Sequence, residues 1–312
     1  MSVRINVNSC WLLGLICILI SCQSNELDYN SHYLPFAQQF EKTSGYDLLA
    51  PSKTYVLPNK LTEISGITTL NDSVLACVQD EAGIVFLYGL VERRILDRIK
   101  FAGNGDYEGI EIVDNHIYIL KSSGKIYQYS TVDKTTNTIN TPLKSSNNAE
   151  GLAYDYQTNQ LLIVCKGKAG LNGEKVVGKA VYGYHLRAGF KPDPLFLVTP
   201  NDLVSWNEKQ KNPIKLSKRK KAFMLSGVAI HPQTNEIYLV ATVGKLLFVL
   251  SPEGKIRHVV PLSPRVFRQP EGICFKPNGD LIISNEGQDG SSNIQIFKKR
   301  AGGLNEVMSV ID

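Results

Sequence analysis

The chain has 312 residues, of which 43% are hydrophobic, enough for one large packed domain or two ordinary ones. Its 34 basic and 29 acidic residues leave a formal charge of +5, which is too mild for a nucleic-acid-binding surface. Cys77, Cys165 and Cys274 lie scattered in apolar runs, so they indicate buried thiols and argue against a disulfide framework or a zinc site.

Residues 1–21 are predicted to be a lipoprotein signal peptide. Arg4 precedes an apolar stretch from Trp11 to Ile20, which is too short to span a membrane comfortably. The stretch ends in Leu19-Ile20-Ser21-Cys22, which resembles a bacterial lipobox, so Cys22 is predicted to carry the lipid. Two or more acyl chains anchor a protein stably, because each buried methylene contributes about 0.8 kcal/mol. No aspartate follows Cys22 directly, which by known sorting rules favours the outer over the inner membrane of a bacterial envelope.

Residues 22–51 are polar and weakly patterned, and we predict a tether between the lipid and a folded domain over 52–312. From Lys53 onward the pattern changes to short apolar strands separated by turn residues.

Five short motifs recur along this domain, each with a polar or acidic residue, a glycine and an aliphatic residue. They are Ser65-Gly66-Ile67, Glu108-Gly109-Ile110, Glu150-Gly151-Leu152, Ser226-Gly227-Val228 and Glu271-Gly272-Ile273. Their glycines are separated by 43, 42, 76 and 45 residues. A period of some forty residues built only of strands is typical of a β-propeller with one four-stranded blade per repeat.

The second repeat shows the expected blade. An inner strand over Glu108–Val113 and a second strand over His116–Lys121 flank a turn at Asp114-Asn115, and a third strand over Lys125–Ser130 precedes a weaker outer strand over Thr136–Pro142. Counting inner strands predicts an all-β propeller of five blades. A sixth blade would have to lie in the 76-residue interval, where Leu161–Lys166, Ala180–Leu186 and Pro194–Val198 already serve the third blade. The remainder of that interval, residues 201–223, is predicted to be a lysine-rich loop.

The last blade lacks an obvious outer strand. After Asn293–Phe297 the best remaining strand candidate is Val307–Val310, whereas Lys53–Pro58 has the character of an outer strand and precedes the first inner strand. We therefore predict that the N-terminal strand completes the last blade and closes the ring, which removes free sheet edges.

The residues before the five glycines are expected to face one another around the central axis. They form a predicted ring of Ser65, Glu108, Glu150, Ser226 and Glu271. Three carboxylates on one axis repel by a few kcal/mol per pair at intermediate dielectric, so either one binds a proton or a cation neutralises them. Ca²⁺ suits these oxygen donors, and the ring residues are its candidate ligands. A second layer of candidate ligand-binding residues comprises Asp80, Glu81, Asn285 and Glu286, with Lys166 as a competing internal cation.

Two other interpretations of the ring stay open. The glutamates are alternatively structural, accepting hydrogen bonds from the backbone of the neighbouring blade. In the second interpretation, Glu108 or Glu150 acts as the base of a metal-dependent hydrolase of the lactonase or esterase kind. Nothing singles out a catalytic residue, because the five histidines are dispersed and no HExxH, GxSxG or phosphate-loop motif occurs.

The motifs taken together resemble the SdiA-regulated family of bacterial β-propellers, especially its lipoprotein members from Bacteroidetes-like bacteria. The resemblance spans residues 47–300 and rests on an ordered set of short strings: Glu63-Ile64-Ser65-Gly66-Ile67, Val78-Gln79-Asp80-Glu81, Asp106-Tyr107-Glu108-Gly109, Asn148-Ala149-Glu150-Gly151-Leu152, Cys165-Lys166-Gly167-Lys168, Ser226-Gly227-Val228, Gln269-Pro270-Glu271-Gly272 and Ser284-Asn285-Glu286. It implies an envelope propeller distantly related to NHL and gluconolactonase-type propellers, without an established reaction. The lysine-rich insertion at 201–221 departs from the family pattern.

Together, the signal segment, the repeats and the ring of carboxylates lead us to expect a membrane-anchored envelope propeller that binds a small-molecule, glycan or protein ligand at the mouth of its channel. A metal-dependent hydrolase and a purely structural scaffold are the alternatives.

Overall fold

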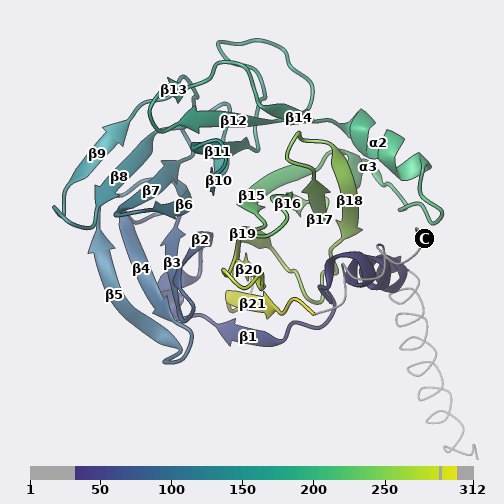
Figure 1. Ribbon diagram of the computed structural model, residues 1–312, viewed down its shortest axis with the longest axis horizontal. Coiled ribbons are helices and arrows are strands. Elements are labelled where there is room, and N and C mark those ends of the chain that lie inside the picture. Colours follow the sequence, from purple (N-terminus) through teal and green to yellow (C-terminus); the bar gives the residue numbers. More distant parts are fainter. Residues whose placement is uncertain (1–31, 288–289, 301–312) are drawn as a thin grey trace, which may run out of the picture.

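The strands form a ring of five antiparallel sheets around a central axis in a computed structural model that describes residues 32–287 and 290–300 (Figure 1). Each sheet is one blade, and its strands run from the axis outward in chain order in blades 1 to 4. The prediction of a five-bladed all-β propeller is therefore confirmed, and the described part of the long third interval holds no sixth sheet.

The strands of the five blades have the following bounds. Blade 1 contains β2 (Ile64–Asn71), β3 (Val74–Gln79), β4 (Ile84–Gly89) and β5 (Arg94–Lys100). Blade 2 contains β6 (Tyr107–Val113), β7 (His116–Lys121), β8 (Ile126–Ser130) and β9 (Thr136–Ile139). Blade 3 contains β10 (Ala149–Asp155), β11 (Gln160–Cys165), β12 (Lys179–His185), β13 (Gly189–Phe190) and β14 (Phe196–Val198). Blade 4 contains β15 (Met224–Ile230), β16 (Ile237–Val243), β17 (Leu246–Leu250) and β18 (Ile256–Pro261). Blade 5 contains β19 (Pro270–Phe275), β20 (Leu281–Asn285), β21 (Asn293–Phe297) and β1 (Lys53–Val56).

The N-terminal strand closes the ring as predicted. β1 pairs antiparallel with β21, in a register that places Lys53 opposite Ile296 and Val56 opposite Asn293. The backbone N–H of Ser52 extends the ladder by donating to the carbonyl of Ile296 at 2.8 Å. The competing strand candidate, Val307–Val310, lies outside the described residues.

The inner strands approach one another so closely that only glycine fits at their crossing. A Cβ atom added to Gly66, Gly151 or Gly272 would lie 2.9 Å from a backbone atom of the next inner strand, and one added to Gly227 would lie 2.4 Å from the Glu271 carbonyl oxygen. Gly109 makes the fifth such approach, at 2.9 Å from the backbone nitrogen of Leu152. We call these five residues the glycine waist. The axial cavity there measures about 10 Å³, which is about the room of one water molecule, so the waist separates the two ends of the axis.

The blades pack through apolar side chains on both faces of their sheets. The thiols of Cys77, Cys165 and Cys274 are free and buried in this packing, as predicted. Burial raises the pKa of the Cys77 thiol to about 12, which keeps it protonated and unreactive at neutral pH.

Part of the predicted tether folds onto the propeller. Residues 32–44 form a helix that packs against blades 4 and 5, and Phe40 and Tyr46 are fully enclosed there. The Tyr46 hydroxyl donates to the Gly279 carbonyl at 2.5 Å and lies 2.9 Å from Nε2 of His231. Residues 32–51 of the predicted tether are therefore ordered, because their few aromatic side chains find an apolar surface to cover. Residues 22–31 and the predicted signal peptide lie outside the described part of the chain.

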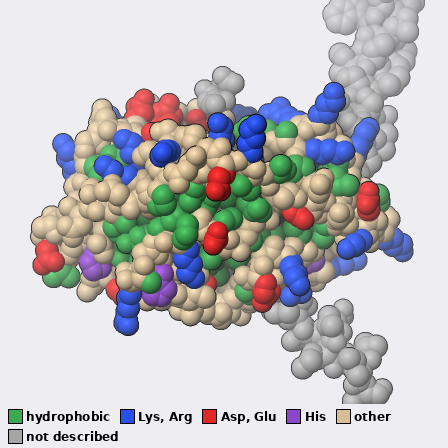
Figure 2. Space-filling model, turned by 90° about the horizontal axis from the view of Figure 1, so that it is seen from above, with side chains coloured by type: hydrophobic (Ala, Val, Ile, Leu, Met, Phe, Trp, Pro, Cys, Tyr) green, Lys and Arg blue, Asp and Glu red, His purple; other side chains and the backbone are tan. Residues whose placement is uncertain are grey.

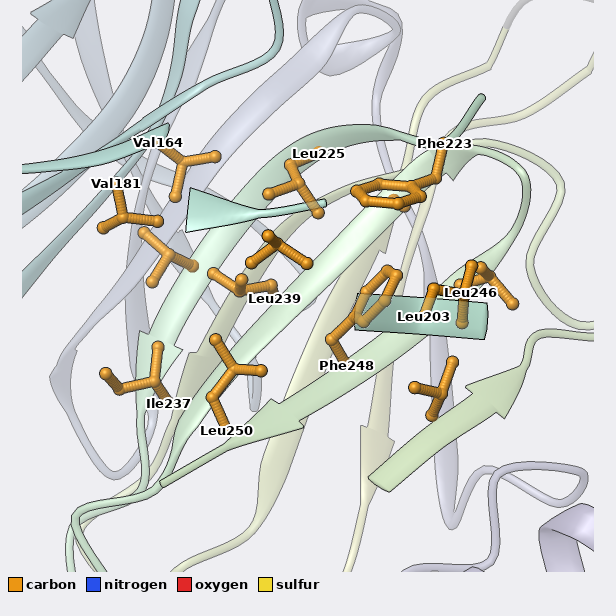
Figure 3. Packing of buried hydrophobic residues seen from close by; sticks show 14 of the residues in the cluster. Val164, Val181, Leu203, Phe223, Leu225, Ile237, Leu239, Leu246, Phe248 and Leu250 are labelled. Atoms are coloured by element: carbon orange, nitrogen blue, oxygen red, sulfur yellow. The ribbon is translucent and has the colours of Figure 1, made fainter. Parts of the chain in front are cut away.

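The predicted loop at 201–223 also contains ordered structure. Helix α2 (Pro200–Glu208) begins with a capping box in which Thr199 and Asp202 each accept a backbone hydrogen bond from the other, and a short helix, α3 (Lys218–Lys221), follows. The segment presents Leu203 and Phe223 to the face of blade 4, where Phe223 packs against Phe248 (Figure 3). Within the described ranges no helix is long and apolar enough to cross a membrane.

Blade 3 has an incomplete outer edge, because β12 pairs with two fragments of two and three residues, β13 and β14.

In Figure 2, which views the propeller from its rim, apolar side chains gather along the middle of the visible face and basic side chains lie around them.

Candidate functional site

The five residues that precede the glycine waist come together at one end of the axis, as predicted. This is the end at which inner strands begin and second strands finish, so residues of both strands meet there. Ser65, Glu108, Glu150 and Ser226 line the axial cavity, and Glu271 lies beside them with its side chain buried. We call the group formed by these five residues with Asp80, Asp106, Lys166, Asn285 and Glu286 the axial mouth.

The two serines of the ring lock blades together. The Ser65 hydroxyl donates to the carbonyl of Tyr107 at 2.6 Å, and the Ser226 hydroxyl donates to the carbonyl of Pro270 at 3.0 Å. Each acceptor immediately precedes the ring glutamate of the next blade. These bonds join neighbouring inner strands through the serines as donors. They do not test the structural interpretation of the ring, which concerns the glutamates as acceptors. Both serines are also predicted ligands of a metal ion. In the structure their hydroxyl groups form these hydrogen bonds between blades.

Lys166 forms an ion pair with one ring glutamate, Glu150, from the end of the second strand of blade 3. Its Nζ lies 3.2 Å from Oε1 of Glu150, which also accepts a 2.6 Å hydrogen bond from the side chain of Asn148. Burial alone would lower the pKa of Lys166, but the carboxyl groups of Glu150, Glu271 and Glu108 together raise it above its ordinary value. Lys166 is thus the internal cation that was predicted to compete with a metal ion for the carboxylates of the ring.

One ammonium group does not neutralise three carboxylates. Burial raises the pKa of Glu108 well above its usual range, and the neighbouring Glu150 and Asp106 raise it further. Burial also raises the pKa of Glu271 to about 7, against the opposing effect of Lys166. The axial mouth therefore holds extra protons at neutral pH, which is one of the two outcomes expected for converging carboxylates.

A second layer of acidic residues lies around the ring. Burial, followed by the charge of Glu63 and then of Glu286, raises the pKa of Asp80 to about 6. Oδ1 of Asp80 and Oδ1 of Asn285 are both buried without a hydrogen-bond donor. Glu81 is exposed, with its backbone N–H donating to Gln79 at 2.6 Å, so it belongs to the rim of this layer.

Two residues that act on the ring glutamates, Asp106 and Gln269, are not among the site residues predicted from the sequence. Asp106 acts on Glu108 and accepts a hydrogen bond from Ser122, and Gln269 donates to the carboxyl groups of Glu271 and Glu286. Each lies two residues before a ring glutamate. Alignment of the repeats on their glycines would have pointed to both positions.

The ring does not have the form of a ready metal site. Across residues 32–287 and 290–300, no group of three or more His, Cys, Asp or Glu side chains is placed to hold a metal ion. Lys166 accounts for this in physical terms, since an ammonium group at 3.2 Å from Glu150 competes with any cation for the same oxygen. Calcium binding by Glu108, Glu150 and Glu271 remains a prediction.

Comparison with known proteins identifies the fold and no family. No protein-family model and no curated protein sequence matches the chain. Among solved structures, a glutaminyl cyclase from Myxococcus xanthus aligns with a TM-score of 0.53 at 13% identity, over 80% of this chain and 95% of that one. A luciferin-regenerating enzyme aligns with a TM-score of 0.46 at 11% identity over 80% and 95% of the two chains. A virginiamycin B lyase from Staphylococcus aureus gives 0.42 at 12% identity over 80% and 75%.

At 13% identity, the likeness to the glutaminyl cyclase supports the fold alone. Function therefore has to be argued from the axial mouth.

The raised pKa of Glu271 predicts a pH dependence of stability. The folded protein binds a proton at Glu271 between pH 4.5 and about 7, whereas the unfolded chain has already released it, so the free energy of unfolding should fall as pH rises through this window. Glu271→Gln should flatten this decline. The test is the difference in free energy of unfolding between parent and variant, measured in urea from pH 4 to 8. A difference that stays constant with pH would contradict the prediction.

Proposed function

We propose that the chain is an envelope β-propeller that binds a cationic ligand at the axial mouth. The observation that supports it is the pair of orphaned acceptors, Oδ1 of Asp80 and Oδ1 of Asn285, each buried without a donor. A buried acceptor without a donor is costly, and native proteins satisfy nearly all of them. A ligand carrying N–H groups, or a cation coordinated by oxygen, would satisfy both.

The charge of the axial mouth supports the same choice of ligand. Asp80, Asp106, Glu108, Glu150, Glu271 and Glu286 supply its carboxyl groups. Among the described residues, Lys166 forms an ion pair with Glu150 and with no other carboxyl group of the axial mouth. A ligand with an ammonium or guanidinium group would offset the remaining repulsion and release the protons held there. Ca²⁺ is the inorganic alternative, because carboxylate and amide oxygens are its usual donors.

The proposal includes an anchor in the outer membrane through a lipid on Cys22, which rests on the lipobox-like sequence at residues 19–22. Intact mass of the processed protein tests it, since diacylation at Cys22 adds a defined mass. Membership of the SdiA-regulated family is proposed on the motif set alone. A residue-by-residue alignment of the five waist glycines with members of that family would test it.

We favour binding over the hydrolase and scaffold alternatives on two physical grounds. A metal-dependent hydrolase needs a metal with an open coordination position and a free base, and Glu150, one candidate base, is engaged by Lys166 and Asn148. A purely structural scaffold does not account for two buried acceptors without donors, Asp80 Oδ1 and Asn285 Oδ1, within one cluster of carboxyl groups.

The test measures thermal unfolding of the purified full chain with CaCl₂ and, separately, with agmatine, a small amine that also carries a guanidinium group. Ligand at 100 times its dissociation constant should stabilise the protein by about 2.7 kcal/mol. Asp80→Asn should weaken binding of the active probe about ten-fold, since it removes the charge and keeps the shape. Asp97→Asn, on exposed strand β5, is the matched control and should change nothing. The proposal fails if neither probe shifts the melting temperature, or if Asp80→Asn binds as the parent does.

A further inference from the structure

A second cavity lies at the opposite end of the axis, beyond the glycine waist. It measures about 420 Å³ and is lined by the far ends of inner strands and by the turns that follow them. Pockets that bind small molecules typically have about 300–1,000 Å³. The waist closes the axis between this cavity and the axial mouth, so a ligand here would be independent of the first site.

Glu111 supplies a carboxylate to this cavity from strand β6. Its Oε1 accepts hydrogen bonds from the Thr68 hydroxyl at 2.8 Å and from the backbone N–H of Ile112 at 2.9 Å. Its Oε2 accepts a single long bond, 3.3 Å, from the backbone N–H of Tyr154. A carboxylate oxygen has two acceptor positions, so Oε2 retains room for another donor.

Glu111 forms no ion pair with any of the described residues. Lys276 lines the cavity, but its ammonium group donates to the Asp72 carbonyl at 2.7 Å. His231 also lines it, and burial and then Lys299 lower its pKa to about 4, so it is neutral at physiological pH. Asp155, the other acidic lining residue, adds to the negative charge.

The remaining wall is apolar and aromatic. Tyr154 and Tyr156 lie edge to face with ring centroids 4.6 Å apart, and the Tyr156 side chain is 76% exposed. Val228, Ile273 and Phe275 also line the cavity. A large exposed aromatic ring beside a carboxylate is a suitable surface for an organic cation, because ring faces attract positive charge.

We infer that this cavity is a second binding site, for a small organic amine with a flat apolar body. The ammonium group would donate to Oε2 of Glu111 and lie near the ring of Tyr156, while the body would pack against Val228 and Ile273. The inference does not depend on the function proposed for the axial mouth, because it rests on different residues.

A purely structural role is the competing explanation for Glu111. Its bonds to Thr68 of β2 and Tyr154 of β10 tie blades 1, 2 and 3 together. A role in blade packing alone predicts a less stable variant and no ligand preference, so the test has to measure selectivity as well as stability.

Isothermal titration calorimetry on the full chain uses three probes of one shape: tryptamine, neutral tryptophol and anionic indole-3-propionate. We expect tryptamine to bind about ten-fold more tightly than tryptophol, and indole-3-propionate to bind least, because a charge-assisted hydrogen bond is about twice as strong as a neutral one. Glu111→Gln should abolish the preference for tryptamine. Tyr156→Ala, at an exposed position that should not disturb folding, should weaken all binding several-fold. Glu92→Gln, on the exposed turn between β4 and β5, is the matched control.

Three outcomes would overturn the inference. The first is no binding of tryptamine at millimolar concentration. The second is a preference for tryptamine that survives in Glu111→Gln or, if that variant does not fold, binding of tryptamine that Tyr156→Ala leaves unchanged. The third is a preference that Asp80→Asn abolishes and Glu111→Gln does not, since the amine would then be bound at the axial mouth.

Discussion

Gly227→Ala is expected to destabilise the propeller by about 3 kcal/mol or more, beyond most overpacking substitutions. The added methyl would lie 2.4 Å from the Glu271 carbonyl oxygen and 3.0 Å from Cγ2 of Ile273. Backbone of the neighbouring inner strand cannot give way as a flexible side chain can, so β15 and β19 would have to separate. Separation at one interface strains the others, because the ring is closed. The midpoint of urea unfolding measures the effect.

Gly103→Ala is the matched control for that substitution. Gly103 lies on an exposed loop with nothing within 4 Å of an added Cβ. Its variant should match the parent to within about 0.5 kcal/mol. If Gly227→Ala costs no more than Gly103→Ala, the waist is not closely packed, and the separation of the two ends of the axis is in doubt.

The waist also explains why so much of the fold could be predicted. A propeller needs one close approach per blade at the axis, so glycine recurs with the period of the blade. The turns between first and second strands add a further regular signal, since Asp114, Asn159 and Asn235 all adopt the left-handed conformation that those residue types tolerate. Closure by the N-terminal strand followed from counting strands, because a ring leaves no edge unpaired.

The two segments whose ordered structure was not predicted share a different property. Residues 32–51 and 201–223 have no repeat to align with, and they owe their order to the surface they cover. Phe40 and Leu203 are buried only because blades 4 and 5 supply apolar faces to them. Such tertiary effects are invisible in a local pattern, which shows only that these segments are polar on average.

The ring of the axial mouth was predictable from the repeat, whereas its electrostatic balance was not. The position before each glycine identified Glu108, Glu150 and Glu271, but the pairing of Lys166 with Glu150 depends on side-chain geometry. The second cavity was missed altogether. Glu111 lies three residues after Glu108 and does not recur in the other repeats, so no periodic signal marks it.

Lys166→Met tests that balance, and we expect it to cost about 2 to 3 kcal/mol at neutral pH. Removing one partner of a buried ion pair leaves the other charge buried and uncompensated, which typically costs about 3–5 kcal/mol. The lower figure applies because the Lys166 side chain is 24% exposed, although that of Glu150 is only 4% exposed. The Met side chain keeps the apolar packing of the lysine stem, so the loss of stability measures the effect of removing the ammonium charge. Lys100→Met, on exposed strand β5, is the control and should be nearly neutral.

The cost of Lys166→Met should also depend on pH, because burial raises the pKa of Glu150 above 4.5 in the folded protein. At a pH below this raised pKa the folded parent holds Glu150 protonated, so the ion pair is weak and its removal should cost little. As the pH rises above it the parent gains the ion pair, whereas the variant must either keep a proton on Glu150 or bury a bare carboxylate. Adding Glu150→Gln should then recover at least about 1 kcal/mol, measured as coupling in a double-mutant cycle. A cost that is the same at both pH values, without recovery in the double variant, would mean that Lys166 acts through packing and that the carboxylates of the axial mouth are balanced without it.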